Sequence, residues 1–335
     1  MSRPTIYDIA QQAQVSIATV SRVFNGSPRV SAATRERVEH VAEQLNYRPN
    51  VSARNLASQR SNLVMAVVPM LTNYFYMEVV RGVQDRLADT DLDLLVYTAQ
   101  APEYVDGQLE RALQRGRTEG VLLFSTPLTD ARAELVRQAD QPVVLVDSSH
   151  SELDSVFVDN ERGGYEATRH LIEMGYRRIG YLSGHPMSVP AVDRQAGYGR
   201  ALREAGLPFD PDRIYTPQQS RDHGYTECIG YEGMQALLKQ DLDAVFVASD
   251  IQALGALRAI HEAGLRVPED LGVVGFDDIA VSAYVGLTTM RQPMYDMGRQ
   301  AVDALLSRLD APVSASAHSV HYAELVRRNS TEWVG

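Results

Sequence analysis

From Leu63 onward, short apolar runs alternate with amphipathic stretches of helical period. A short apolar run is typical of a buried strand, and a helical period is typical of a helix packed on a sheet. The predicted strands span residues 63–69, 92–98, 120–125, 142–147, 155–158, 178–183, 244–248 and 271–276. The predicted helices span residues 77–89, 106–115, 163–174, 195–205, 231–238 and 251–263. So many strands fit two sheets better than one, which predicts an α/β body with two parallel-sheet subdomains.

The first 60 residues follow a different pattern, that of three short helices. Thr5, Ser16 and Ser31 each offer a hydroxyl oxygen that can cap a helix N-terminus. The second predicted helix ends before Gly26, which can close it. Two helices joined by a tight turn are typical of a helix-turn-helix, so we expect an all-α head in front of the α/β body.

The second predicted helix has one apolar face and one face of small side chains. Val20, Val23 and Phe24 would point inward, and the outward set is Ser16, Ile17, Ala18, Thr19, Ser21 and Arg22. Small hydroxyl and methyl groups allow close approach to a major groove, where they can contact thymine methyls. A generic three-helix bundle explains the apolar spacing but not the ordered hydroxyls, so we expect this helix to contact DNA.

Charge is divided unevenly along the 335 residues, whose net value is −11. Residues 1–60 hold eight arginines against four acidic residues, a net of +4, which leaves −15 for the remainder. This asymmetry is expected if the head binds phosphate and the body binds something else. A merely basic surface helix is the alternative.

Composition excludes several classes of protein. With 44% hydrophobic and 22% charged residues, the chain is typical of a globular protein of two or three domains. A single cysteine cannot form an internal disulfide, and neither a membrane span nor a signal peptide is recognisable, so we expect a cytoplasmic protein without membrane contact. No phosphate loop, nucleophile elbow or metal-ligand spacing occurs, so we expect no enzyme, catalytic residue, cofactor or metal. Asp277 and Asp278 are adjacent, so their side chains should diverge.

Three stretches of the head carry a specific resemblance: Thr5-Ile6-Tyr7-Asp8-Ile9-Ala10, Val15-Ser16-Ile17-Ala18-Thr19-Val20-Ser21-Arg22-Val23-Phe24-Asn25-Gly26, and Val30-Ser31. They resemble the head of the lactose-repressor (LacI/GalR) family of transcriptional regulators. The resemblance implies a helix-turn-helix DNA-binding domain over residues 1–48.

The resemblance continues through Asn46-Tyr47-Arg48-Pro49-Asn50 and Val51-Ser52-Ala53-Arg54-Asn55-Leu56-Ala57. It implies a hinge helix within residues 49–61 that orders when two subunits sit on DNA, with Leu56 wedged into the minor groove. A plain linker helix is the alternative. The candidate DNA contacts are Thr5, Ser16, Ile17, Ala18, Thr19, Ser21, Arg22, Asn25, Ser31, Tyr47, Asn50, Ala53 and Leu56.

The body carries further signatures of the same family. They are Asn73-Tyr74-Phe75-Tyr76, Val158-Asp159-Asn160, and residues 193–198, 248–255, 273–278 and 287–289 with Gln292. They imply an effector-binding and dimerisation domain over residues 62–335, resembling periplasmic binding proteins, with two doubly wound parallel-sheet subdomains joined by three crossing strands. By this resemblance the N-subdomain covers about residues 62–160 and 292–323. The C-subdomain covers about 161–291 and 324–335.

Candidate effector contacts gather at the carboxyl ends of predicted strands, where open α/β sheets bind ligands. Strand ends supply Ser125, Asp147, Ser249, Asp250 and Asp277, and the resemblance adds Asn73, Phe75, Arg194 and Tyr225, with Tyr74 beside them. Carboxylates, amides, one guanidinium and aromatic rings suit a neutral polyol. Asp250 could instead cap the helix that follows, and Tyr74 or Phe75 could be core residues.

The resemblance therefore implies a sequence-specific repressor of a carbohydrate-utilisation operon. We expect a homodimer on a palindromic operator of double-stranded DNA, released by a sugar effector. A purine or nucleoside effector and a co-repressor response stay open. A pure sugar-binding protein is a further alternative, but it would have no use for the head.

Overall fold

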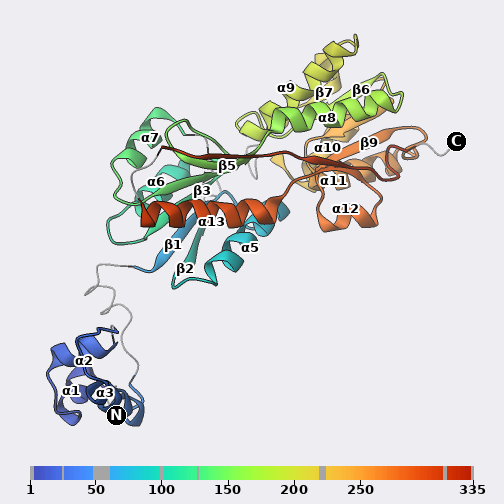
Figure 1. Cartoon of the computed structure of the whole chain (residues 1–335). Coiled ribbons are helices and arrows are strands. Elements are labelled where there is room, and N and C mark those ends of the chain that lie inside the picture. Colours follow the sequence, from blue (N-terminus) through green and yellow to red (C-terminus); the bar gives the residue numbers. More distant parts are fainter. Residues whose placement is uncertain are drawn as a thin grey trace. The chain divides into compact units, whose positions relative to one another are not determined.

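The computed structural model describes residues 4–24, 26–47, 61–98, 102–126, 128–218, 224–311 and 315–332. The chain divides into two compact units, Met1–Asn62 and Leu63–Gly335 (Figure 1). Four predicted DNA contacts, Asn25, Asn50, Ala53 and Leu56, lie outside the described residues. Residues 49–60 of the predicted hinge lie outside them as well, so the hinge stays a prediction.

The first unit contains the three predicted helices: α1 (Ile6–Gln12), α2 (Ile17–Phe24) and α3 (Ala32–Gln44). They pack around a buried apolar cluster that includes Ile9, Val20, Val23, Val38 and Val41. Each of the three helices contributes buried apolar residues to this cluster, and this packing stabilises helices that are too short to be stable alone.

The second unit begins with a six-stranded parallel sheet in the order β11-β5-β4-β3-β1-β2. Its strands are β1 (Leu63–Val68), β2 (Asp93–Thr98), β3 (Gly120–Phe124), β4 (Val143–Val146), β5 (Asp154–Val158) and β11 (His318–His321). Its helices are α5 (Tyr74–Leu87), α6 (Pro102–Ala112), α7 (Asp130–Arg137) and α13 (Met294–Asp310). We call this sheet and these helices the first lobe.

A second six-stranded sheet has the order β12-β10-β9-β8-β6-β7, with only β12 antiparallel to its neighbour. Its strands are β6 (Ile179–Leu182), β7 (Ile214–Tyr215), β8 (Ala244–Val247), β9 (Gly272–Asp277), β10 (Thr288–Arg291) and β12 (Glu324–Val326). The helices are α8 (Asn160–Glu173), α9 (Val189–Glu204), α10 (Glu227–Leu237), α11 (Asp250–Glu262), α12 (Ala280–Tyr284) and the 3₁₀-helix η1 (Pro211–Arg213). We call this sheet and these helices the second lobe.

The chain crosses between the lobes three times. The crossings lie between β5 and α8, between β10 and α13, and between β11 and β12. Figure 1 shows the last crossing as one long segment that runs along both lobes. Two α/β lobes joined by three crossings confirm the predicted fold class.

The predicted strands are found with their ends shifted by at most one residue, but several helices begin earlier than predicted. α5 begins three residues before the predicted start because Asn73 caps it, its Oδ1 accepting from Phe75 N at 2.9 Å. α8 likewise begins early because Asp159 Oδ1 accepts from Arg162 N at 2.9 Å. Apolar periodicity therefore found the buried part of each of these helices. It missed the first turn, which is fixed by the capping residue and not by apolar side chains. The sequence analysis also did not predict α7, α12, α13, β7, β10, β11 and β12.

Three helix pairs approach each other so closely that glycines face the backbone of the partner helix. A side chain at Gly82 of α5 would overlap Tyr295 O, and one at Gly298 of α13 would overlap Val79 O. Equivalent reciprocal pairs are Gly164 with Gly197, between α8 and α9, and Gly230 with Gly255, between α10 and α11. These contacts involve backbone atoms, which cannot rotate away as a side chain can.

Gly298→Ala should therefore lower the free energy of unfolding by about 1–3 kcal/mol, the usual cost of overpacking. Gly107→Ala is the matched control, because Gly107 lies in α6 with open space where its Cβ would be. It should gain about 0.5–1 kcal/mol from helix propensity. Urea unfolding followed by circular dichroism measures both changes, and an equal effect of the two substitutions would contradict the close approach.

Candidate functional site

The outer face of α2 and its cap carry six of the nine predicted DNA-contacting residues that the structure describes. Ser16, Ile17, Ala18 and Arg22 are exposed, Thr19 and Ser21 are half-buried, and Val20 and Val23 on the other face are buried. Ile17 is 42% exposed although it is a large apolar residue. One exposed isoleucine is common on protein surfaces, so the feature that marks this face is its set of short hydroxyl and methyl groups, which allow close approach to a major groove.

Two predicted contacts, Ser16 and Ser31, also cap the helices that they directly precede, α2 and α3. Thr19 N donates to Ser16 Oγ at 3.1 Å, and Thr34 N donates to Ser31 Oγ at 3.3 Å. These caps lie at the N-terminal ends of α2 and α3, where backbone N–H groups favour phosphate. Thr5 is part of a capping box at α1, its Oγ1 donating to Asp8 Oδ2 at 2.8 Å.

Tyr47 is half-buried, and its ring lies 5.8 Å from that of Phe24 between centroids. Burial raises the pKa of its phenol. Tyr47 therefore packs against the C-terminal residue of α2 and helps to hold the helix that presents the other candidates.

Arg35 of α3 holds the C-terminal end of α2. Its Nη1 donates to Val23 O at 3.1 Å, and its Nη2 donates to Ser27 O at 2.9 Å. Both acceptors are carbonyls near a helix end, where intrahelical partners are missing. Arg35 was not among the predicted DNA contacts, and this geometry makes it a support for the helix that carries them.

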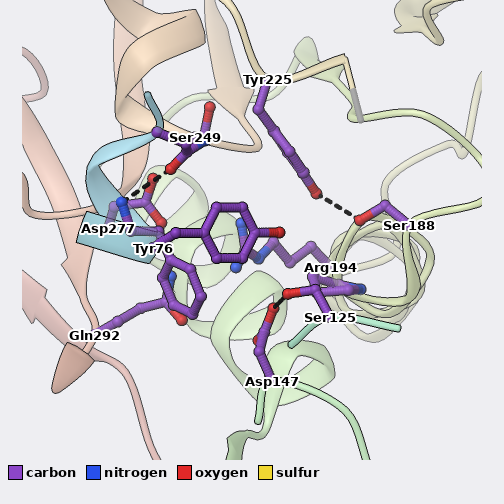
Figure 2. A pocket seen from close by; sticks show the side chains of 12 residues that line it. Tyr76, Ser125, Asp147, Ser188, Arg194, Tyr225, Ser249, Asp277 and Gln292 are labelled. Carbon is purple, nitrogen blue, oxygen red and sulfur yellow. Dashed lines mark hydrogen bonds between the residues drawn. The ribbon is translucent and has the colours of Figure 1, made fainter. Parts of the chain in front are cut away.

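The second candidate site is a cavity lined by residues of both lobes (Figure 2), with about 380 Å³ of empty space in and in front of it, part of which is open solvent. Its lining consists of Asn73, Phe75, Tyr76, Ser125, Asp147, Ser188, Pro190, Arg194, Tyr225, Ser249, Asp277 and Gln292. The cavity lies at the carboxyl ends of β3, β4, β8 and β9, as expected for open α/β sheets.

Three lining residues sit at strand ends with a left-handed backbone. The φ angles are 43° at Ser125, 57° at Asp147 and 126° at Asp277. Residues other than glycine rarely adopt such angles, and strained backbone of this kind clusters at functional sites. The unusual backbone at the ends of β3, β4 and β9 accompanies side chains that line the cavity instead of continuing the strand.

The polar lining is rich in hydrogen-bond acceptors. Ser125 Oγ donates to Asp147 Oδ2 at 2.6 Å, and Gln292 Nε2 donates to Asp277 Oδ1 at 2.6 Å. Asp147 Oδ1 and Gln292 Oε1 are buried without a partner among the described residues. A buried acceptor without a donor is costly, so a molecule that fills this cavity gains most by supplying donors.

Arg194 brings positive charge to the same cavity. Its Nε donates to Asn160 Oδ1 at 2.8 Å and its Nη1 to Ala248 O at 2.6 Å. The guanidinium carbon lies 3.7 Å from the ring centroid of Phe276. Two donors and one face of the guanidinium are thus engaged, which fixes the orientation of Arg194.

Aromatic rings form the apolar part of the lining. Phe75 and Tyr76 pack edge to face, with centroids 5.3 Å apart. Tyr225 extends toward Ser188, whose Oγ lies 3.2 Å from the phenol oxygen (Figure 2). Rings beside carboxylates suit the C–H face and the hydroxyls of a polyol.

Burial dominates the electrostatics of the cavity. It raises the pKa of Asp147 to about 6, against the opposing effects of the Ser125 hydrogen bond and the charge of Arg194. Burial also raises the pKa of Asp277, which Arg194 and Gln292 lower again. Neither carboxylate is fully compensated by the protein itself.

Eight of the ten predicted effector contacts line the cavity: Asn73, Phe75, Ser125, Asp147, Arg194, Tyr225, Ser249 and Asp277. Tyr74 does not, because its neighbours on α5 point inward while its own side chain is 41% exposed. Asp250 does not either. Its Oδ2 accepts from Ser282 Oγ at 2.6 Å and from Ile279 N at 3.1 Å, and its Oδ1 accepts from Thr289 Oγ1 at 2.6 Å.

Asp250 therefore ties α11 to β10 and α12 below the cavity. The capping role considered for it belongs to Ser249, whose Oγ accepts from Gln252 N at 3.3 Å. Four lining residues were not predicted as contacts: Tyr76, Ser188, Pro190 and Gln292. Gln292 belonged to a quoted family signature, and Tyr76 adjoined a predicted contact, so both carried a signal. Ser188 and Pro190 lie in the first turn of α9, ahead of its apolar period.

Two further features bear on function. Within the described residues, no group of three or more His, Cys, Asp or Glu is placed to hold a metal ion. The helices in the same part of the chain include none that is long and apolar enough to span a membrane.

Comparisons with known proteins find relatives for both units of the chain. Residues 5–50 match the family model of bacterial regulatory proteins, lacI family, and residues 168–331 match that of a periplasmic binding protein-like domain. Catabolite control protein A of Priestia megaterium is 35% identical over 308 residues, covering 90% of this chain and 91% of that protein. Other relatives are named transcriptional or operon repressors.

Solved structures give the same result. A lac repressor dimer bound to operator and the anti-inducer ONPF has a TM-score of 0.86 at 30% identity, covering 98% of this chain and 99% of that chain. A complex of the transcriptional regulator CelR with cellobiose has a TM-score of 0.74 at 33% identity, covering 98% and 100%.

The raised pKa of Asp147 gives a stability prediction. The folded protein binds a proton at Asp147 more tightly than the unfolded chain does. The folded state is therefore stabilised as the pH falls through about 6. Above pH 6, Asp147 is charged and the folded state carries the full free-energy cost of burying that charge. Asp147→Asn should raise the free energy of unfolding at pH 8 by about 1–3 kcal/mol and flatten the dependence between pH 8 and 5.

Thermal unfolding of wild type and variant across that pH range tests this. Asp91→Asn on the exposed surface is the control and should leave both stability and its pH dependence nearly unchanged. An Asp147→Asn protein that is less stable than wild type at pH 8 would show that the carboxylate stabilises the fold.

Proposed function

The chain belongs to the lacI family of bacterial regulatory proteins, and we propose that it is a sequence-specific DNA-binding repressor whose operator affinity is controlled by a small uncharged sugar. The head binds operator DNA and the cavity binds the effector. The acceptor-rich, aromatic-walled cavity is the observation that carries the effector class.

The DNA-binding part of the proposal rests on the exposed face of α2. Its small side chains, with Ile17 exposed and Arg22 beside them, suit a major groove. The capping residues Ser16 and Ser31 are exposed at the N-termini of α2 and α3, and exposed helix N-termini suit phosphates. Operator binding through Asn25, Asn50, Ala53 and the Leu56 wedge is proposed from sequence alone.

The effector part rests on the balance of donors and acceptors. Asp147 Oδ1 and Gln292 Oε1 need donors, which sugar hydroxyls supply in number. Two buried carboxylates disfavour a phosphorylated or otherwise anionic effector.

A nucleoside is the second candidate, because its ribose hydroxyls are donors and its base could stack on Tyr225 or Phe75. A free purine base, the other alternative, has fewer donors to offer Asp147 and Gln292. A panel of compounds separates these three classes.

We propose a homodimer, since a two-fold symmetric protein matches a palindromic operator. The body exposes several large apolar side chains that a partner subunit could cover, among them Leu71, Tyr74 and Met77 near the start of α5. This role would account for the exposure of Tyr74. A protein that binds operator DNA works where the bacterial chromosome is, so we propose a cytoplasmic location.

Members of this family are transcription regulators and not enzymes, and we propose no catalytic activity for this one. Asp277 and Asp278 diverge as expected: Asp277 lines the cavity, whereas Asp278 accepts from Arg328 Nη2 at 2.6 Å and from Arg291 Nε at 2.7 Å. Neither pairs with a nucleophile.

The proposed function is tested with duplexes from upstream of the chain's own gene and a panel of D-ribose, D-glucose, D-galactose, cellobiose, adenosine, cytidine and hypoxanthine. Fluorescence anisotropy should find a duplex bound with a Kd of about 10⁻⁸ M or tighter, at least about a thousandfold more tightly than random DNA. One sugar should weaken that binding by about 5–150-fold. Indifference to every duplex would refute the repressor, and a response to adenosine or cytidine alone would replace the sugar with a nucleoside.

Arg35 gives a prediction for the head. Arg35→Leu should weaken operator binding about tenfold, because the charged hydrogen bonds to Val23 O and Ser27 O are lost. The slope of log affinity against log salt should stay the same, since Arg35 acts on α2 and not on a phosphate. Arg22→Leu removes the same charge from the exposed face and should reduce that slope by about one if it meets a phosphate. A slope reduced by Arg35→Leu would instead make Arg35 a direct phosphate contact.

A further inference from the structure

A buried amide behind the cavity connects three segments that form its walls. Gln252 of α11 is fully buried, and its Nε2 donates to Ser183 O at 2.9 Å and to Gly224 O at 3.0 Å. Carbonyl oxygens only accept, so the amide group must point its nitrogen at both. Its Oε1 then accepts from Ser249 Oγ at 3.2 Å. One side chain thus joins the end of β6, the segment before α10 and the N-terminus of α11.

The first consequence concerns Tyr225, which follows Gly224 directly. Its ring lies over Gly184, where a Cβ would stand 2.5 Å from Tyr225 Cζ. Its hydroxyl pairs with Ser188 Oγ at 3.2 Å. Three contacts therefore position Tyr225. Ser188 contacts its hydroxyl and Gly184 lies against its ring. Gln252 holds the backbone carbonyl of the preceding residue, Gly224.

The second consequence concerns Ser249, whose hydroxyl proton points to Gln252 Oε1. The oxygen of Ser249 can then only accept a hydrogen bond from a molecule in the cavity. Gln252 thereby extends the acceptor-rich lining, although it is not itself a lining residue.

We propose that Gln252 is a positioning residue that sets the effector affinity of the cavity through Tyr225 and Ser249. It fixes where the aromatic wall stands and which polarity Ser249 presents, without touching the effector. The inference rests on the proposed function, because it takes a sugar in this cavity as the effector.

The test substitutes methionine, which is unbranched, similar in length and without N–H donors. The matched control is Gln141→Met. Gln141 is also buried, and its Nε2 donates to a backbone carbonyl, Gln114 O, at 3.1 Å, but it does not line the cavity. Isothermal titration with D-ribose, D-glucose and cellobiose should give a Kd at least about tenfold weaker in Gln252→Met than in wild type. Gln141→Met should stay within about threefold, and both variants should bind operator normally without sugar.

Double-mutant cycles show whether Gln252 acts through its two partners. Gln252→Met should weaken sugar binding much less in a Tyr225→Ala or a Ser249→Ala background than in wild type. Such non-additivity in either cycle supports the proposal, and full additivity in both overturns it. A merely destabilising substitution would weaken binding equally in every background.

Hydrogen exchange of the sugar-free protein supplies a measurement that does not depend on the effector. Amides in residues 224–230 should exchange faster in Gln252→Met and not in Gln141→Met. A wild-type protein that binds none of these three sugars nor D-galactose would refute the proposed effector class. Unchanged exchange in residues 224–230 would overturn the role of Gln252, whatever the effector is.

Discussion

Backbone contact between paired helices is the constraint on which the geometry of the cavity depends. At each of the three glycine pairs, two helices touch through their backbones without a side chain between them. Each of these helix pairs also includes residues that line the cavity, at or near the start of a helix. The α5–α13 pair positions Phe75, the α8–α9 pair positions Arg194, and the α10–α11 pair supports Ser249. A shift of one helix must move its partner, because backbone atoms in contact cannot rotate away as a side chain can. The rigid helix pairs therefore set the frame of the cavity, within which side chains such as Gln252 position the Tyr225 wall.

That chemistry opposes stability. Asp147 and Gln292 each hold a buried oxygen without a donor, and burial raises the pKa of Asp147 and Asp277. Left-handed backbone at three strand ends adds conformational strain. None of these features helps the chain to fold, and all of them face one cavity. Features that lower the stability of the fold and gather at one place are characteristic of a binding site, where a ligand supplies the missing hydrogen-bond donors.

The sequence predicted the parts of this fold that depend on local pattern. Buried parallel strands such as β3 and β4 are continuous apolar runs, so their ends were found to within one residue. Short or polar strands such as β7 and β11 carry no such signal, since their pairing comes from strands far away in the chain. Strand-end acids were recognised as site candidates, but sequence could not tell Asp277, which faces the cavity, from Asp250, which is engaged by Ser282 and Thr289. Gln252 stood within the family signature at residues 248–255, but its role could not be predicted, because the fold alone brings it to the carbonyls of Ser183 and Gly224.

Because the lining comes from both lobes, a bound ligand links them. Asp147 belongs to the first lobe and Arg194 to the second, while Gln292 lies on a crossing between them and donates to Asp277. A ligand that hydrogen-bonds both lobes must favour any arrangement in which both sets of groups reach it, and it can shift an equilibrium only by its difference in affinity for the two states. A compound that contacts one lobe alone would bind without a response. Donors at Asp147 and Gln292 are therefore only part of what an effective effector must supply, because it must also contact a second-lobe group such as Arg194 or Asp277.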